Sequence, residues 1–245
     1  MKNFQPAIKW SGSKRSQARD IVVNFPTHMD TYYEPFCGGA SVLRALLGTN
    51  TVVNRYVCSD LNEDLINLWN TIKNDYKSVS EHYSALWHSM NDNETDKSFK
   101  KKFFETIRDR YNKERNPLDF MFIMRTTTNG MPRYNQNGEF NNSFHITRDG
   151  ITPDKLDNIL KEWSNLLNEH DVIFKCCSYE DINPSENDFM YLDPPYANTK
   201  GMYFGGFDNN KFFEWLSNIK CPYALSYDGI SGNDDNTFEV PRNLY

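Results

Sequence analysis

The stretch that most constrains the fold is the apolar run Phe189–Leu192, which ends abruptly on the sequence Asp193-Pro194-Pro195-Tyr196. This pattern predicts a buried strand of an open α/β sheet. Such sheets bind ligands at the carboxyl ends of their strands, which is where Asp193 would lie. Two successive prolines remove two N–H donors, so the turn offers the Asp193 carboxylate and the Pro194 carbonyl as hydrogen-bond acceptors.

Acceptors of this kind suit a flat substrate that carries an amino group. The lone pair of an exocyclic amine on a nucleobase is delocalised into the ring. Accepting hydrogen bonds from both of its N–H groups would localise that pair on nitrogen and make it nucleophilic, with Tyr196 stacked on the base. The alternative is a proline-rich strand exit in which Asp193 caps the next segment, and these residues alone do not decide between the two.

Length and composition limit the number of domains and the class of protein to which this chain can belong. The 245 residues suffice for one α/β domain with an insertion, or for two small domains. No segment approaches the roughly 18 apolar residues of a membrane span, and the start lacks a signal peptide, so we expect a cytoplasmic protein. Five cysteines without a C-x-x-C pair predict reduced thiols rather than disulfides or a zinc site. The net charge of −6 argues against a wholly basic nucleic-acid binder but leaves room for a local basic face.

A glycine turn forms a second motif. Residues 32–41 (YYEPFCGGAS) predict a strand and a glycine turn, followed by a helix over 42–47. The next apolar run, Thr51–Cys58, leads to Asp60, which lies 21 positions after Gly39. A spacing of about 20 is typical of a carboxylate that binds a ribose hydroxyl. A third glycine at dinucleotide spacing is missing, which argues against NAD, and the alternative role for Asp60 is an N-cap of a helix over 62–70.

Two further segments carry candidate cofactor contacts. A short loop around Gly12 precedes a helix that ends near Pro26, and its N–H groups together with Lys14 could bind an anion. A flexible loop with solvated lysines is the alternative. Asp181 follows the predicted strand Val172–Cys177, where it would accept a hydrogen bond from the adenine amine of a cofactor.

Between residues 75 and 151 the sequence becomes polar and helical. The dipeptide Asn137-Gly138 predicts a β-hairpin. Arginine matches guanine and asparagine matches adenine, so a hairpin with such side chains can read base edges, although an ordinary surface hairpin would also be polar. The candidates for these DNA contacts are Asn129, Arg133, Asn135 and Asn141.

Taken together, the chain resembles the Dam-type (D12 class) S-adenosylmethionine-dependent DNA adenine-N6 methyltransferases. The resemblance rests on motifs in the order of that family: Lys9-Trp10-x-Gly12-x-Lys14, Glu34-Pro35-Phe36-Cys37-Gly38-Gly39, Asp60, Asn129-Gly130-x-x-Arg133-Tyr134-Asn135, Gly138-Glu139-Phe140-Asn141 and Asp193-Pro194-Pro195-Tyr196. It implies an α/β, Rossmann-like, S-adenosyl-L-methionine-binding catalytic domain over residues 1–74 and 152–245. A mainly helical target-recognition domain with a β-hairpin would be inserted at 75–151.

The resemblance also implies roles for individual residues. Positions that contact or shape the cofactor site are Trp10, Lys14, Glu34, Pro35, Phe36, Gly38, Gly39, Asp60 and Asp193, and the catalytic turn is Asp193, Pro194, Pro195 and Tyr196. The implied reaction methylates N6 of a flipped-out adenine in a short site of double-stranded DNA, GATC or a variant, as in restriction-modification systems. No metal and no membrane are expected, and the oligomeric state is left open.

Two departures from the family pattern bear on this expectation. Only 49 residues follow Tyr196, so we expect a C-terminally incomplete sheet with an exposed edge strand. Residues 142–145 read Asn-Ser-Phe-His where GATC-methylating relatives generally have Val-Pro-Phe-Gly, which leaves the recognition sequence open. The alternatives are methylation of an RNA base and a catalytically silent DNA-binding relative.

Overall fold

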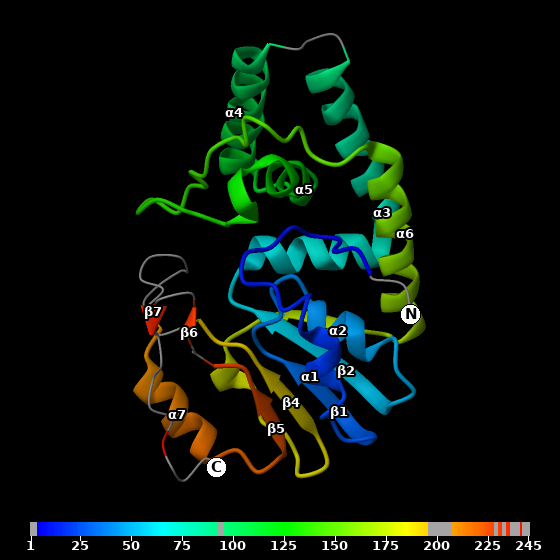
Figure 1. The fold of residues 1–245 in the computed structure, drawn as a ribbon, viewed down its shortest axis with the longest axis vertical. Helices are drawn as coiled ribbons and strands as arrows, with labels where there is room; N and C mark the ends of the chain where they lie inside the picture. Colours follow the sequence, from blue (N-terminus) through cyan, green and yellow to red (C-terminus); the bar gives the residue numbers. More distant parts are fainter. Residues whose placement is uncertain are drawn as a thin grey trace.

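A computed structural model describes residues 4–92, 96–195, 207–227, 230–231, 234–235 and 241 (Figure 1). Its centre is a five-stranded sheet in the order β3-β2-β1-β4-β5, and every neighbouring pair is parallel. The strands are β1 (His28–Glu34), β2 (Val52–Asp60), β3 (Ile173–Cys176), β4 (Phe189–Leu192) and β5 (Tyr223–Leu225). This mixed α/β architecture is consistent with the Rossmann-like fold expected from the sequence. Two short strands, β6 (Ile230–Ser231) and β7 (Asp234–Asp235), form a separate antiparallel pair.

The order of the strands explains where a ligand site forms. From β1 the chain builds outward through β2 to β3, and it then returns to place β4 and β5 on the other side of β1. Strand β4 pairs with β1 in the register Tyr32↔Phe189 and Tyr33↔Met190. The carboxyl ends of β1 and β4 therefore lie side by side at the point where the order reverses, which is where open α/β sheets bind ligands.

Helices cover the sheet and build a second, helical half (Figure 1). They are α1 (Ala18–Val22), α2 (Ser41–Leu46), α3 (Glu63–Asn91), α4 (Lys97–Glu114), α5 (Pro117–Thr126), α6 (Pro153–Glu169) and α7 (Asn209–Ser217). The main core joins the sheet to the helices. Trp69 of α3 stacks on Phe174 of β3 with 5.2 Å between ring centroids and packs against Trp163 of α6 with 4.9 Å between ring centroids. A smaller buried cluster lies under α7 and includes Leu192 and Phe212.

Helix α3 links the two halves, because its first part lies against the sheet and its second part belongs to the helical half. Asp75 interrupts it with non-helical angles (φ −151°, ψ 64°), and its carboxylate accepts a hydrogen bond from the Ser78 N–H at 3.2 Å. Asp75 thus acts as a cap inside a continuous helix. The sequence-based boundary between residues 74 and 75 coincides with this kink, while the assignment of 75–151 as a recognition domain stays a prediction.

The expected β-hairpin is only partly formed. Gly138 has a φ of 75° and donates to the Asn135 carbonyl at 3.0 Å, which closes a tight three-residue loop. Short antiparallel pairing follows: the N–H groups of Asn135 and Asn141 donate to the carbonyls of Glu139 and Arg133, both at 2.9 Å, and isolated bridges join Tyr134↔Phe140 and Thr127↔Phe144. The two arms of the hairpin are thus paired, although neither forms a named strand. On the outer side of this pairing, the Asn112 side chain of α4 bonds both the N–H and the carbonyl of Phe140, at 2.8 and 3.0 Å, and so holds the hairpin against α4.

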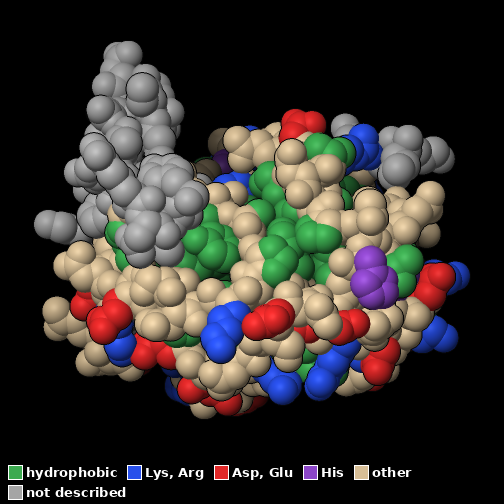
Figure 2. All heavy atoms as spheres, turned by 90° about the horizontal axis from the view of Figure 1, so that it is seen from below, with side chains coloured by type: hydrophobic (Ala, Val, Ile, Leu, Met, Phe, Trp, Pro, Cys, Tyr) green, Lys and Arg blue, Asp and Glu red, His purple; other side chains and the backbone are tan. Residues whose placement is uncertain are grey.

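In the view from below, hydrophobic side chains gather in the middle of the face, and acidic and basic side chains are mixed beneath them (Figure 2). Among the helices that the structure describes, none is both long and apolar enough to cross a membrane.

Candidate active site

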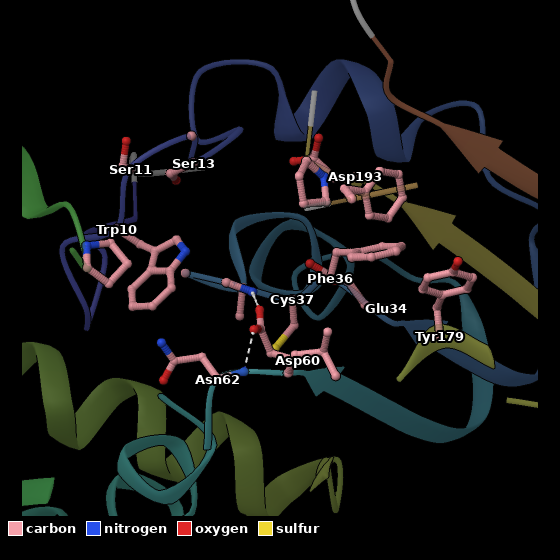
Figure 3. Close-up of a pocket in the computed structure, with 18 of the residues that line it drawn as sticks. Trp10, Ser11, Ser13, Glu34, Phe36, Cys37, Asp60, Asn62, Tyr179 and Asp193 are labelled. Atoms are coloured by element: carbon pink, nitrogen blue, oxygen red, sulfur yellow. Dashed lines mark hydrogen bonds between the residues drawn. The ribbon is translucent and has the colours of Figure 1, made fainter. Parts of the chain in front are cut away.

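A cavity of about 470 Å³ opens at the carboxyl ends of β1, β2 and β4 (Figure 3). It lies where the strand order reverses, as the topology requires. The sequence-predicted residues that line it are Trp10, Lys14, Glu34, Phe36, Gly38, Gly39, Asp60, Asn135, Asp193 and Pro195. The structure therefore brings the N-terminal loop, the glycine turn and the Asp-Pro-Pro segment to one site.

The glycine turn is fixed on both sides of Gly38. Its N–H donates to Asp60 Oδ2 at 3.1 Å, and its carbonyl accepts from Trp69 Nε1 at 2.9 Å. Gly38 has a φ of 45°, and a Cβ there would lie 2.9 Å from the Trp10 indole. A glycine is required at this position, because a side chain would meet both unfavourable backbone angles and the ring of Trp10.

Asp60 joins β2 to the glycine turn. Its second oxygen, Oδ1, accepts from the Asn62 N–H at 3.0 Å. Burial raises the pKa of Asp60, and the hydrogen bonds from the N–H groups of Asn62, Gly38 and Leu61 oppose that rise. The N-cap of α3 is Asn62, which accepts from the Leu65 N–H at 2.9 Å, so Asp60 is not the helix cap of the alternative interpretation. Its carboxylate instead forms part of the cavity wall.

Asp193 follows β4 and forms an ion pair with Lys14. The Lys14 ammonium donates to both carboxylate oxygens, at 2.6 and 2.7 Å. Burial raises the pKa of Asp193, and the charge and hydrogen bonds of Lys14 act in the opposite direction. The lysine of the N-terminal loop thus contacts the catalytic candidate directly.

Glu34, the last residue of β1, is a buried carboxyl group that lines the same cavity. Only 3% of its surface is exposed, and its Oε2 accepts a hydrogen bond from the Tyr32 hydroxyl at 2.7 Å. Burial raises the pKa of Glu34 to about 8, with a further contribution from the negative charge of Asp193. At neutral pH this side chain is therefore mostly protonated, unlike an ordinary glutamate.

Some predicted residues do not reach the cavity. Pro35 and Pro194 are buried and are not part of its lining. Asp181 is exposed, and its Oδ2 accepts from the Ser178 N–H at 3.0 Å in a capping box of η2 (Tyr179–Asp181). The structure thus leaves Asp181 outside the cavity lining, with one oxygen used in the capping box, and the cofactor role assigned to it stays a prediction. Tyr196 lies outside the described residues.

Other residues reach the cavity without having been predicted. The segment Ser178–Glu180 lines it, as do Leu61, Asn62, Pro132 and Tyr134. Leu61 is 60% exposed, so its apolar surface is available to a ligand in the cavity that it lines. Ser178–Glu180 follow the end of β3, and Leu61 and Asn62 follow the end of β2. This position just past a strand end is the sequence signal by which these five residues could have been found.

The partial hairpin forms one wall of the cavity through Pro132, Tyr134 and Asn135. The Tyr134 hydroxyl donates to Asp64 Oδ2 at 3.2 Å and accepts from Asn62 Nδ2 at 3.4 Å, which ties the hairpin to the start of α3. The recognition candidates are therefore attached to the same wall as Asp60.

The four predicted DNA contacts separate into two groups. Asn129, Arg133 and Asn141 are exposed. The Asn135 side chain is instead used within the turn: Oδ1 accepts from two N–H groups at 2.9 Å, and Nδ2 donates to Glu139 Oε2 at 2.8 Å. Three of the four side chains are thus presented to solvent, and Asn135 shapes the loop.

Comparison with known proteins agrees with this geometry. A family model for the D12 class N6 adenine-specific DNA methyltransferases matches residues 10–215. This range includes the glycine turn, the helical half and Asp193.

Several relatives match most of the chain. The type II methyltransferase M.FokI of Planomicrobium okeanokoites is 31% identical over 230 residues, which are 92% of this chain and 34% of that protein. The type II methyltransferase M.MjaIII of Methanocaldococcus jannaschii is 31% identical over 206 residues, which are 78% of this chain and 69% of that protein. The DNA adenine methylase of Escherichia coli K12 is 30% identical over 204 residues, which are 80% of this chain and 66% of that protein. The chain thus spans about a third of the length of M.FokI and about two thirds of the other two. By the extent of the family match and by these relatives, the chain belongs to the D12 class of N6 adenine-specific DNA methyltransferases, whose members use S-adenosylmethionine.

Proposed function

We propose that this chain transfers a methyl group from S-adenosylmethionine to N6 of adenine in a short site of double-stranded DNA, GATC or a variant of it. The observation that carries this proposal is the position of Asp193. It lies at the carboxyl end of β4, on the wall of the cavity that Asp60 and the glycine turn also line. A base held by Asp193 would therefore face the cofactor cavity.

The cavity fits S-adenosylmethionine in size and chemistry. Its volume of about 470 Å³ falls within the roughly 300–1,000 Å³ of small-molecule sites. The sulfonium is a cation, and the cavity offers the carboxylates of Asp60 and Asp193 with the aromatic rings of Trp10, Phe36 and Tyr179. When bound, S-adenosylmethionine supplies an electrophilic methyl group on a positively charged sulfur.

Individual residues can be given roles toward the cofactor. Asp60, held by the backbone of Gly38 and Asn62, presents its carboxylate to the ribose hydroxyls. Trp10 packs on the glycine turn and closes one side of the cavity, and the exposed apolar surface of Leu61 suits the face of the adenine ring. Glu34, mostly protonated at neutral pH, adds a polar group without a full negative charge.

The target amino group is held by Asp193, which lines the cavity, and the carbonyl of the adjacent Pro194, which the sequence predicted as a second acceptor, lies outside the lining. Each Asp193 oxygen accepts one hydrogen bond from Lys14, and because a carboxylate oxygen can accept two, the amino group can bind beside the ammonium. When both N–H groups of the adenine amine donate hydrogen bonds to these acceptors, the lone pair of N6 is localised on nitrogen, which makes it more nucleophilic. Positioning and fixed charges then supply the rate enhancement, and no covalent enzyme intermediate is required.

The adenine must leave the duplex stack to reach this cavity, which costs a few kcal/mol. The helical half is placed to assist, because its hairpin wall carries the exposed Asn129, Arg133 and Asn141 next to the cavity. These three side chains are the proposed contacts to the DNA around the target base.

The proposal is tested by transfer of radiolabelled methyl from S-adenosylmethionine to unmethylated duplex DNA and to RNA of the same sequence. Nucleoside analysis and mapping of the modified sites follow. We expect N6-methyladenine in the duplex at a defined site. Modification of RNA alone would support the RNA alternative, and retained DNA binding without transfer would support a catalytically silent relative.

A further inference from the structure

A short turn connects the cavity wall to the exposed face of the hairpin. It consists of residues 128–131 and contains η1 (Thr128–Gly130). Asn129 is exposed at its tip with a φ of 57°, and the next residue after the turn, Pro132, lines the cavity. The conformation of this turn therefore sets where Asn129 and the nearby Arg133 stand relative to the cavity.

One side of the turn is held by the N-terminal loop. The Ser11 N–H donates to the Gly130 carbonyl at 3.0 Å. Gly130 has a φ of 63°, and a Cβ there would lie 2.6 Å from Lys9 Cγ and 2.8 Å from the Lys9 carbonyl oxygen. This close backbone contact fixes the middle of the turn but leaves its two ends to be held elsewhere.

Asn142 holds both ends. Its Nδ2 donates to the carbonyls of Thr128 and Met131, each at 3.0 Å, and its Oδ1 accepts from the Ser143 N–H at 2.7 Å. A single amide thus spans the turn from its first residue to its last. A valine at this position would offer no donor: the Met131 carbonyl would lose this hydrogen bond, and the Thr128 carbonyl would keep only the longer one from the Met131 N–H, at 3.4 Å.

We infer that Asn142 is a positioning residue for DNA sequence discrimination. It keeps the turn 128–131 in one conformation, so that Asn129 and Arg133 meet the base edges in one register. A loosened turn still carries both side chains and can still contact DNA, so loss of Asn142 lowers discrimination more than affinity. This inference rests on the proposed function.

The variants Asn142→Ala and Asn142→Asp test it. Alanine removes the amide, whereas aspartate keeps its size but replaces the donor with an oxygen that repels the two carbonyls. Asn168→Ala is a matched control, because Asn168 Nδ2 also donates to two carbonyls, those of Lys73 and Ser164, at 2.7 and 2.8 Å. This control removes the same kind of interaction at the contact between α3 and α6.

A duplex site is first selected from a random pool by binding to the wild-type protein. Kd is then measured by fluorescence anisotropy, at one salt concentration and with S-adenosylhomocysteine, for this site and for each single-base-pair change. Discrimination is the Kd for a changed site divided by the Kd for the selected site. We expect this ratio to fall by about tenfold in both Asn142 variants and to be unchanged in Asn168→Ala.

Three results would overturn the inference: an unchanged ratio in both Asn142 variants, an equal loss of affinity for every duplex, or a wild-type protein that selects no sequence. Binding is measured here without methyl transfer. A failure of the catalytic proposal is therefore seen in the transfer assay and is distinguishable from a failure of this one.

Discussion

Lys14 and Asp193, separated by 179 positions in the sequence, meet in a two-pronged ion pair with N···O distances of 2.6 and 2.7 Å. The two side chains are only 13% and 17% exposed, so solvent screens the pair weakly. Burial raises the pKa of Asp193, and Lys14 opposes this rise. Lys14 therefore helps to keep Asp193 ionised and able to accept hydrogen bonds.

Removing this lysine should shift the pH dependence of catalysis. In Lys14→Met, burial acts on Asp193 without an opposing charge, so its pKa rises and protonation removes the acceptor at a higher pH. We expect the acid limb of kcat/KM for duplex DNA to move to higher pH, as measured between about pH 5 and 9. Lys73→Met, which removes an ion pair with the exposed Asp171, is the control. Equal loss of rate at every pH, with the limb in place, would contradict this role.

Glu34 predicts a pH dependence of stability. Its pKa of about 8 in the folded protein lies above the ordinary 4.5 of the unfolded chain, so the folded state binds the proton more tightly. The stabilisation of the folded state by this proton is complete below the unfolded pKa of Glu34 and is lost as the pH rises toward 8. Between pH 5 and 8 the free energy of unfolding of the wild type should fall relative to Glu34→Gln, by up to about 1.4 kcal/mol per pH unit. Urea unfolding at several pH values measures this, and parallel curves for the two proteins would show that Glu34 is not protonated.

Two buried tryptophans allow a matched test of the glycine turn. Trp69 Nε1 donates to the Gly38 carbonyl and Trp163 Nε1 to the Gln5 carbonyl, both at 2.9 Å. Trp69→Phe and Trp163→Phe each remove one buried hydrogen bond, worth about 1 kcal/mol. Only Trp69→Phe should weaken binding of S-adenosylhomocysteine, by about fivefold in calorimetry. An equal effect of both substitutions would mean that Trp69 acts through general stability alone.

Arg133 is exposed on the hairpin side of the cavity. If it binds guanine through two hydrogen bonds, Arg133→Ala should lower discrimination at one base pair by about 1–3 kcal/mol. Methylation rates on duplexes with single-base-pair changes would show this loss. A uniform decrease on all duplexes would instead place Arg133 on a phosphate.

Much of the sheet and part of the site follow from sequence patterns. Apolar runs that end on Asp60 and Asp193 predicted β2 and β4, and the structure places both carboxylates in the lining of one cavity. The reason is general: parallel strands deliver the residues after them to the same edge of the sheet. Local patterns therefore sufficed where backbone geometry alone decides the position.

Three features of the structure were not foreseen from the sequence patterns. Asn112 of α4 binds the N–H and the carbonyl of Phe140 on the outer side of the hairpin, and no hairpin signal in the sequence reveals this contact. Asp181 was assigned to a cofactor, yet the nearby Ser178 N–H takes its carboxylate. The change in composition placed a boundary at Asp75, and α3 continues through this residue with a kink that the sequence did not indicate.

The central claim is that Asp193 accepts hydrogen bonds from the target amine. It is tested most directly by single-turnover methyl transfer to duplex DNA, at saturating cofactor and DNA, in the wild type and in Asp193→Asn. Asparagine keeps the size of the side chain but loses the charge and one acceptor oxygen. We predict a rate at least about 100-fold lower, with N6-methyladenine as the wild-type product and DNA binding retained by the variant. A near-wild-type rate of N6-methyladenine formation in Asp193→Asn would contradict the account.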